Sequence, residues 1–342
     1  IELAHRLAEQ QSASLGVGFL GGNLNGAQGE LAFPQGQQCR LIILEVSEVM
    51  VKRPFGDLEF CAESLDGQRR LTGRLLGASR AQLVHTTVEQ DVDALLGYSM
   101  RQLCLEDPED RLKDTRYTQP ALYVVNALHA RRALDDGVRP AWLAGHSLGE
   151  YNALLAAGAF DFLTGLRLVQ KRGELMAQAR GGGMAAVLGL GPEAIAAVLA
   201  DNGLDAIDMA NFNSPSQTVI SGPVGDIQRA GPLLQAAGAR MCMPLPVSAA
   251  FHSRYMADAA REFEAFLAPM AFAAPQTPVV ANATAQPYPA EGGDAVKALL
   301  VAQITGSVRW VDSVRFLLGQ GVDRFEEIGP GNVLSRLVQQ IR

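Results

Sequence analysis

The feature that most constrains this sequence is a short turn with a serine at its centre and a glycine on each side. Gly145-His146-Ser147-Leu148-Gly149 has the form G-x-S-x-G, between a predicted buried strand at 141–144 and a helical pattern over 148–157. Larger side chains at the glycines would collide with neighbouring elements. A helix N-terminus beside the serine favours a developing oxyanion. We therefore predict a nucleophile at Ser147, the alternative being a glycine-rich turn without chemistry.

Composition excludes several classes of protein. The chain has 342 residues, 48% of them hydrophobic, which is enough to bury a full core. A net charge of −7 argues against general binding to nucleic acids or membrane surfaces, and no apolar run reaches the roughly 18 residues needed to cross a bilayer. The cysteines form no C-x-x-C pair, so we expect reduced thiols, no metal site and a cytoplasmic protein.

The order of predicted elements indicates an α/β protein with two subdomains. Residues 184–247 show the β-α-β-β-α-β order of ferredoxin-like folds. Residues 56–183 and 248–342 alternate between helix and strand, which predicts one large catalytic α/β subdomain around that insert. The glycines at 181–183 are interpreted as a hinge. Residues 1–55 show no sustained period and are assigned as an uncertain N-terminal segment or linker.

A serine nucleophile needs a general base, and the sequence offers five histidines. The side chain of His146 should point away from its neighbour Ser147, and His129 lies on a predicted helix. His252 follows an apolar run at a loop, where catalytic side chains commonly lie. Loop histidines are also commonly solvated or capping residues, so position alone leaves His252 as one candidate.

Several motifs in register resemble the malonyl-CoA:acyl-carrier-protein transacylase family. The resemblance covers roughly residues 90–342 and is greatest to the discrete acyltransferases that serve polyketide synthases in trans, with the fatty-acid enzyme as the related member. The matching segments are Gly145-His146-Ser147-Leu148-Gly149-Glu150-Tyr151, Gln170-Lys171-Arg172-Gly173, Ala250-Phe251-His252-Ser253, Gly329-Pro330-Gly331-Asn332-Val333-Leu334, Thr118-Gln119-Pro120-Ala121-Leu122 and Asn211-Phe212-Asn213-Ser214-Pro215.

The resemblance implies an α/β-hydrolase-like large subdomain with an inserted ferredoxin-like subdomain, and a ping-pong reaction without a cofactor. Ser147 would take malonyl from malonyl-CoA, and the phosphopantetheine thiol of an acyl carrier protein would take it from Ser147. His252 would be the base in both steps, oriented by backbone carbonyl groups near Thr305-Gly306-Ser307-Val308.

The same resemblance assigns substrate contacts. Arg172 would pair with the malonyl carboxylate, because a planar guanidinium can hold a carboxylate through two parallel hydrogen bonds. Gln119 and Asn213 would line the pocket. Phe251, before the base, and Leu148, after the nucleophile, accompany malonyl use in this family, since a phenyl ring would crowd an α-methyl group.

The oxyanion hole is where the sequence departs from the family. It would be formed by backbone N–H groups of Leu148 and of a glutamine in F-P-G-Q-G-S-Q, a heptad that this chain lacks. Gln35 lies in the more similar segment, whereas Gln68 has the expected spacing to Leu96-Gly97-Tyr98. Because spacing fixes geometry, we predict Gln68.

The sequence leaves two other functions open. A proofreading acyl hydrolase would use the same serine and histidine, but it would have no use for a buried Arg172. A silent module that docks carrier proteins would not need Ser147 and His252. An acidic carrier protein would favour a basic surface, for which Arg254, Arg309 and Lys171 are candidates.

Overall fold

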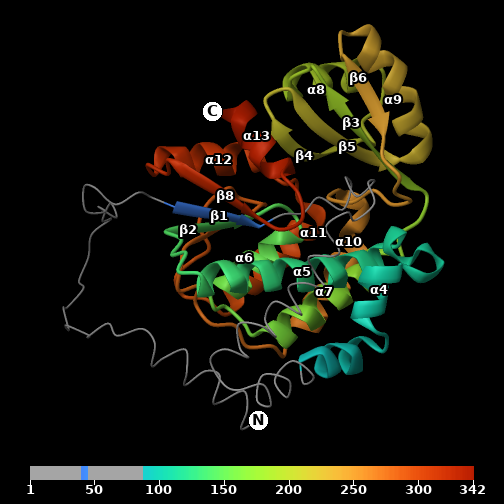
Figure 1. Cartoon of the computed structure of the whole chain (residues 1–342). Helices are drawn as coiled ribbons and strands as arrows, with labels where there is room; N and C mark the ends of the chain where they lie inside the picture. The colour runs from blue at the N-terminus through green and yellow to red at the C-terminus, as the bar shows by residue number, and fades with distance from the viewer. Residues whose placement is uncertain (1–39, 45–87) are drawn as a thin grey trace, which may run out of the picture. The chain divides into compact units, whose positions relative to one another are not determined.

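The computed structural model describes residues 40–44 and 88–342, and these contain two β-sheets (Figure 1). The first sheet is parallel, with strand order β7-β2-β1-β8, and the second is antiparallel, with strand order β4-β5-β3-β6. The parallel sheet comprises β1 (Arg40–Leu44), β2 (Trp142–Gly145), β7 (Val279–Val280) and β8 (Arg324–Ile328).

Strand β1 corrects one part of the sequence analysis. Arg40–Leu44 lies within residues 1–55, which were assigned as an uncertain segment or linker. These five residues instead pair in parallel with both β2 and β8, inside the first sheet. A run of four apolar residues is too short for periodicity to separate a buried strand from an apolar stretch of loop.

Helices lie on both faces of the parallel sheet, and β2 shows why. Leu143 packs into a core with Leu154 and Leu166, whereas Trp142, one residue earlier, packs into a second core with Trp310. Successive strand residues face opposite sides of a sheet, so each face of β2 needs its own cover. The first core is lined by α5 (Thr115–Asp135), α6 (Gly149–Ala156), α7 (Phe162–Met176), α10 (Ala257–Leu267) and α11 (Asp294–Thr305), the second by α12 (Trp310–Gly319) and α13 (Val333–Ile341).

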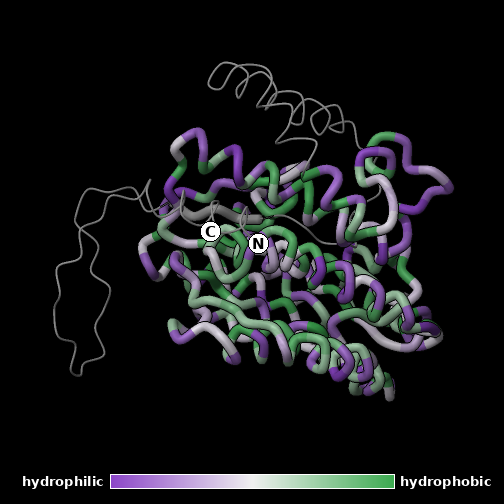
Figure 2. The backbone as a smooth tube through the Cα atoms, turned by 90° about the horizontal axis from the view of Figure 1, so that it is seen from below, coloured by the Kyte–Doolittle hydropathy of each residue, from purple (hydrophilic) through white to green (hydrophobic). Residues whose placement is uncertain are grey.

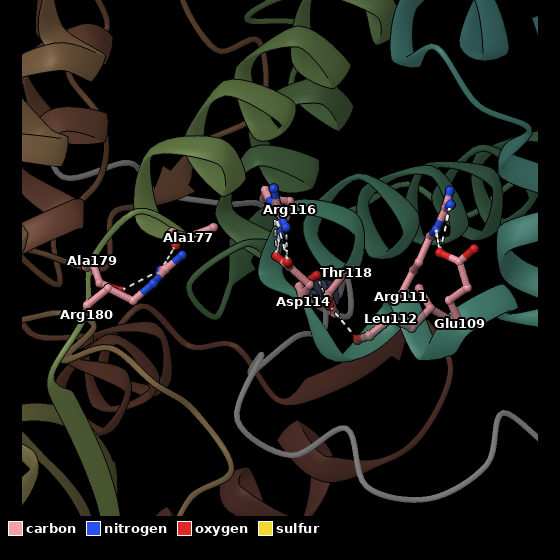
Figure 3. A network of polar contacts seen from close by, with 9 residues as sticks. All are labelled: Glu109, Arg111, Leu112, Asp114, Arg116, Thr118, Ala177, Ala179 and Arg180. Atoms are coloured by element: carbon pink, nitrogen blue, oxygen red, sulfur yellow. Dashed lines mark hydrogen bonds and ion pairs between the residues drawn. The ribbon is translucent and has the colours of Figure 1, made fainter.

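Helix α5 begins where a local polar network fixes its first turn (Figure 3). The Asp114 carboxylate accepts a hydrogen bond from the Arg116 backbone N–H at 3.0 Å and is the N-cap of the helix. The Thr118 hydroxyl donates to the Leu112 carbonyl oxygen at 2.6 Å. This network fixes the start of α5 at Thr115, one helical turn before Gln119. Residues 88–96 are also helical and are followed by α4 (Met100–Glu106) and the 3₁₀ helix η1 (Pro108–Lys113).

The antiparallel sheet confirms the predicted order of elements over 184–247. Its elements are β3 (Gly182–Leu188), α8 (Pro192–Asp201), β4 (Asp208–Ser214), β5 (Gln217–Pro223), α9 (Val224–Ala236) and β6 (Met241–Pro244). A separate core, which includes Val187, Ile195 and Ile220, lies between this sheet and its two helices. Figure 1 shows α8 and α9 beside the sheet.

The glycines interpreted as a hinge differ from that prediction. Gly182 and Gly183 belong to β3, and of the three glycines only Gly181 has a positive φ, of 74°. A Cβ on Gly182 would stand 2.3 Å from the Ala250 backbone nitrogen. Glycine is thus required here for close packing against the segment that precedes His252.

Strand β4 of the antiparallel sheet is hydrogen-bonded to the loop between α11 and α12. The Phe212 N–H donates to the Val308 carbonyl oxygen at 2.9 Å, and the Val308 N–H donates to the Ala210 carbonyl oxygen at 2.8 Å. The Ser307 hydroxyl also donates to the Met209 carbonyl oxygen at 2.6 Å. Edge strand β4 therefore pairs with the loop that follows α11.

Hydrophobic and hydrophilic stretches alternate along the chain in Figure 2, as amphipathic helices packed on one face require. In α13, for example, Leu334, Leu337 and Val338 are buried and recur at helical spacing. None of the helices within residues 88–342 combines the length and the apolar composition that a membrane-spanning helix requires.

Helix α13 is capped from β8, which gives a first prediction. The Glu327 carboxylate accepts hydrogen bonds from the N–H groups of Leu334 at 3.0 Å and Ser335 at 2.7 Å. Glu327→Ala should lower the free energy of unfolding by about 1 kcal/mol, the usual cost of losing a cap. Denaturant unfolding measures this, with Glu326→Ala on the same strand as the control. Equal loss in both variants would contradict the capping role.

Candidate active site

The serine turn is built from a strand end, a strained residue and a helix start. Strand β2 ends at Gly145 and α6 begins at Gly149. Ser147 has a φ of 51°, a left-handed conformation that is costly for a residue other than glycine. A Cβ on Gly145 would stand 2.0 Å from the carbonyl carbon of Gly149. The glycines therefore let strand and helix approach closely, as the sequence predicted.

The serine faces one of the five histidines. Ser147 Oγ lies 2.8 Å from His252 Nε2, and both residues are buried. His252 Nδ1 faces two backbone carbonyl oxygens, of Gln303 at 3.0 Å and of Gly306 at 3.1 Å. Because a carbonyl only accepts hydrogen bonds, Nδ1 carries the proton and Nε2 is left to accept one from the serine. This arrangement can activate a hydroxyl nucleophile.

Burial, together with the nearby Arg172 and His146, lowers the pKa of His252 from 6.5 to about 3, against the opposing effect of the two backbone carbonyl groups. The imidazole is therefore neutral at neutral pH. A neutral imidazole is the form that can take a proton from the serine.

A buried cation lies beside the nucleophile. Arg172, on α7, has no exposed surface, and its Nη2 donates to Ser147 Oγ at 3.1 Å. Its Nη1 donates to Gln119 Oε1 at 2.7 Å, so the structure brings Gln119, from α5, into the same cluster. An acyl group attached to Ser147 would thus have a guanidinium within reach of its distal end.

The structure places the other predicted residues less directly. Asn213 Oδ1 lies 2.8 Å from Nε2 of His146, so it contacts the serine turn but not the serine. Phe251 is buried in the main core next to His252. Leu148 is the N-cap of α6, where N–H groups lack intrahelical partners. Gln68, and the competing Gln35, lie outside the described residues.

Three further polar residues hold the site, and sequence reasoning missed them. Asn282 and Gln303 hydrogen-bond to the backbone of the serine turn, and Glu150 contacts both of them. Glu150 is part of the matching segment that begins at Gly145, but the sequence assigned it no role. Asn282 follows strand β7 and Gln303 precedes the Thr305–Val308 segment, so polar residues at strand and helix ends were the available signal.

A cleft of about 570 Å³ reaches His252 between β4 and the loop that follows α11. It is lined by Asp208, Met209, Phe212, His252, Arg254, Thr305, Gly306 and Ser307. Arg254 at this cleft donates to the Asp208 carboxylate, at 2.9 Å through its Nε. Within the described parts of the chain, no three His, Cys, Asp or Glu side chains converge so as to hold a metal ion.

Comparison with known proteins agrees with this geometry. Residues 69–341 match the family described as acyl transferase domain. The chain is 51% identical over 255 residues to the polyketide biosynthesis malonyl CoA-acyl carrier protein transacylase BaeC of Bacillus velezensis, covering 74% of this chain and 87% of BaeC. It is 55% identical over 248 residues to the polyketide biosynthesis protein ThaF of Burkholderia thailandensis, covering 72% of this chain but only 21% of ThaF.

Solved structures of malonyl transacylases also resemble this chain. The malonyl CoA-acyl carrier protein transacylase of Burkholderia pseudomallei superposes with a TM-score of 0.76 and 41% identity, over 90% of this chain and 98% of that one. A malonyl-transacylase in complex with its type II polyketide synthase acyl-carrier protein superposes with a TM-score of 0.75 and 32% identity, over 88% of this chain and 92% of that one.

The low pKa of His252 gives a second prediction, on stability. The folded state keeps His252 neutral down to about pH 3, whereas the unfolded chain binds a proton below pH 6.5. Stability is therefore lost as pH falls below 6.5, with a slope of about 1.4 kcal/mol per pH unit. His252→Gln removes this effect, so the variant should gain roughly 2 kcal/mol relative to the unsubstituted protein between pH 7.5 and 5.

Denaturant unfolding at several pH values measures this difference. Ser147→Ala is the control, because it keeps His252 and should keep the pH dependence of the unsubstituted protein. A His252→Gln difference that stays constant between pH 7.5 and 5 would show that His252 titrates alike in the folded and unfolded states.

Proposed function

Because this chain belongs to the acyl transferase domain family, we propose that it moves malonyl from malonyl-CoA to the phosphopantetheine thiol of an acyl carrier protein. The names of BaeC and of the B. pseudomallei enzyme support this activity. The polyketide relatives support a role in polyketide synthesis, with an acyl carrier protein as the partner. The reaction needs no cofactor, because the serine itself carries the acyl group.

In the first half-reaction, Ser147 Oγ attacks the thioester carbonyl of malonyl-CoA while His252 Nε2 takes the hydroxyl proton. The tetrahedral oxyanion would be held by backbone N–H groups of Leu148 and Gln68. It collapses by breaking the C–S bond, and coenzyme A leaves as a thiol with the proton from His252. The product is a malonyl ester of Ser147.

In the second half-reaction, the carrier-protein thiol gives its proton to His252 Nε2 and attacks the same carbonyl carbon. Collapse of the intermediate breaks the C–O bond, and the proton returns from His252 to Ser147 Oγ. One imidazole, neutral at the start of each step, therefore serves both directions of proton transfer.

The observation that carries the choice of malonyl is the place of Arg172. Arg172 has no exposed surface and lies 3.1 Å from the nucleophile, so an acyl chain that ends in a carboxylate could pair with its guanidinium. Malonyl supplies such a carboxylate, and a neutral acyl chain does not. Arg172 therefore favours malonyl transfer over the proofreading hydrolase. Gln119 would orient the guanidinium, and Phe251 and Asn213 would shape the pocket against bulkier acyl groups.

The second oxyanion donor is proposed to be the backbone N–H of Gln68. The family order is a strand followed by the glutamine segment. Strand β1 ends at Leu44, so Gln68 follows a strand of the sheet, whereas Gln35 precedes it. Chain order thus supports Gln68.

We also propose that the fold is α/β-hydrolase-like, with a ferredoxin-like small subdomain at 184–247 inserted between 56–183 and 248–342. The antiparallel order β4-β5-β3-β6 supports the ferredoxin-like assignment, because each βαβ unit is split by an antiparallel strand.

The proposed function predicts a covalent intermediate. Incubation with malonyl-CoA, without a thiol acceptor, should add one malonyl group to the intact protein, as measured by mass spectrometry. Ser147→Ala should abolish the added mass, because no other hydroxyl lies against His252 Nε2 in the described part of the chain. Labelling that persists in Ser147→Ala would exclude Ser147 as the nucleophile.

Arg172 gives a fourth prediction, which separates transferase from hydrolase. Arg172→Ala should cost malonyl transfer about 2–5 kcal/mol, the usual loss for one partner of a buried charge pair. This corresponds to roughly 30- to several thousand-fold in kcat/KM. Acetyl transfer should be spared, because acetyl has no carboxylate.

The measurement is kcat/KM for malonyl-CoA and acetyl-CoA, with Arg167→Ala, an exposed arginine on the same helix, as the control. Equal losses for both substrates would assign Arg172 a structural role. If the unsubstituted protein hydrolyses neutral acyl thioesters faster than it transfers malonyl, the hydrolase function is correct instead.

A further inference from the structure

We propose that Glu150 is a positioning residue, which holds the serine turn in its reactive geometry by accepting hydrogen bonds from Asn282 and Gln303. Its proposed effect is on acyl transfer by Ser147 and therefore rests on the function proposed above. Glu150 does not touch the serine hydroxyl, so it would act only through Asn282 and Gln303.

The first observation is how completely Glu150 is buried and surrounded by donors. It lies in the first turn of α6 with no exposed surface. Its Oε1 accepts from the Tyr288 hydroxyl, and its Oε2 accepts from Gln303 Nε2 and, at 3.3 Å, from the Asn282 backbone N–H. All three groups donate, and a carboxylate only accepts, so the residue type matches its surroundings.

The second observation is what Asn282 holds. Its Oδ1 accepts from the Ser147 backbone N–H at 2.6 Å, and its Nδ2 donates to the Gly145 carbonyl oxygen at 2.6 Å. One side chain thus bridges the end of β2 and the strained serine. Asn282 can do so only while its own backbone is fixed, and Glu150 holds that backbone N–H.

Gln303 holds the other side of the turn. Its Nε2 donates to the Ser147 carbonyl oxygen at 2.9 Å, and its Oε1 accepts from Arg172 Nη2 at 3.2 Å. Its backbone oxygen faces His252 Nδ1 at 3.0 Å. Gln303 therefore links the nucleophile, the histidine and the guanidinium. Glu150 Oε2 supports the orientation of this amide, because a carboxylate oxygen can pair only with the NH₂ end.

The ionisation of Glu150 depends on burial and on its neighbours. Burial raises the pKa of its carboxyl group to about 7, while the hydrogen bonds from Tyr288, Gln303 and Asn282 and the charge of Arg172 oppose that rise. The Gln303 amide stands between the carboxylate of Glu150 and the guanidinium of Arg172. The guanidinium therefore favours the ionised form of Glu150, although burial opposes it.

Loss of the acceptor would weaken the support of both residues. Without Glu150, the Gln303 amide would lose one of the contacts that orient it, and the Asn282 backbone N–H would lose its acceptor. The φ of 51° at Ser147 would then have weaker support, and the hydroxyl would drift from His252. A displacement of about 1 Å in a reacting group costs on the order of 100-fold in rate.

The test compares Glu150→Ala, Glu150→Gln and Tyr288→Phe with the unsubstituted protein. Glutamine can keep its carbonyl toward Gln303 and Asn282 and turn its NH₂ toward the Tyr288 oxygen, so it preserves the two contacts that matter. Tyr98→Phe is the matched control for Tyr288→Phe, since the Tyr98 hydroxyl is buried and has no hydrogen-bond partner among the described residues.

Two rates are measured, together with the Tm of each variant. One is malonyl transfer, as kcat and KM. The other is the reaction of Ser147 with a fluorophosphonate, in which the serine oxygen bonds to phosphorus, fluoride leaves and His252 takes the proton. The second rate needs no malonyl recognition, so it tests Glu150 even if the proposed substrate is wrong.

We expect Glu150→Ala to lower kcat and the fluorophosphonate rate together, by about 100-fold, with little change in KM. Glu150→Gln should recover both rates to within about tenfold of the unsubstituted protein. Tyr288→Phe should cause a smaller loss, and Tyr98→Phe none. If Glu150→Ala does not fold, the recovery by Glu150→Gln and the contrast between the two tyrosine variants still test the proposal.

Unchanged rates in a folded Glu150→Ala variant would overturn the proposal. So would a folded Glu150→Gln variant that loses about 100-fold in both rates, because it retains the acceptor. Failure of malonyl transfer in the unsubstituted protein, with a normal fluorophosphonate rate, would instead count only against the proposed function.

Discussion

The contact between Ser147 Oγ and His252 Nε2 joins residues 105 positions apart, at 2.8 Å, and the surrounding structure serves to hold it. Each residue has an unfavourable backbone conformation, with φ values of 51° and 54°. Each such residue costs of order 1–3 kcal/mol and persists only where its surroundings determine it. The parallel sheet, the close-packed glycines and the polar network behind the turn together provide that constraint.

The site must also compensate the cost of burying charged groups. Arg172 and Glu150 are both fully buried, and an isolated buried charge would cost several kcal/mol. Hydrogen bonds to Gln119, Gln303 and Tyr288 replace the water that these charges lose. The same burial that makes the charges expensive also lowers the pKa of His252, so a neutral base and a buried cation exist side by side.

Much of this arrangement could be predicted from the sequence, because it depends on local signals. Glycine positions predict the G-x-S-x-G turn, and apolar periodicity predicts the elements at 184–247. Strand β1 could not be placed, because a short run of apolar residues has no alternating pattern and its partner strands lie about 100 and 280 residues away. Glu150, Asn282 and Gln303 were missed for a related reason, since their role exists only once three distant segments meet.

The antiparallel sheet also contributes to the orientation of His252. Gly306, whose carbonyl oxygen faces His252 Nδ1, lies in the loop that β4 holds through Val308 and Ser307. The Asn213 side chain, on the same strand, contacts His146 in the serine turn. Edge strand β4 thus touches both the loop that orients the base and the turn that carries the nucleophile. A shift of the small sheet would alter the two together, because the backbone pairing with Val308 and the Asn213 contact belong to one strand.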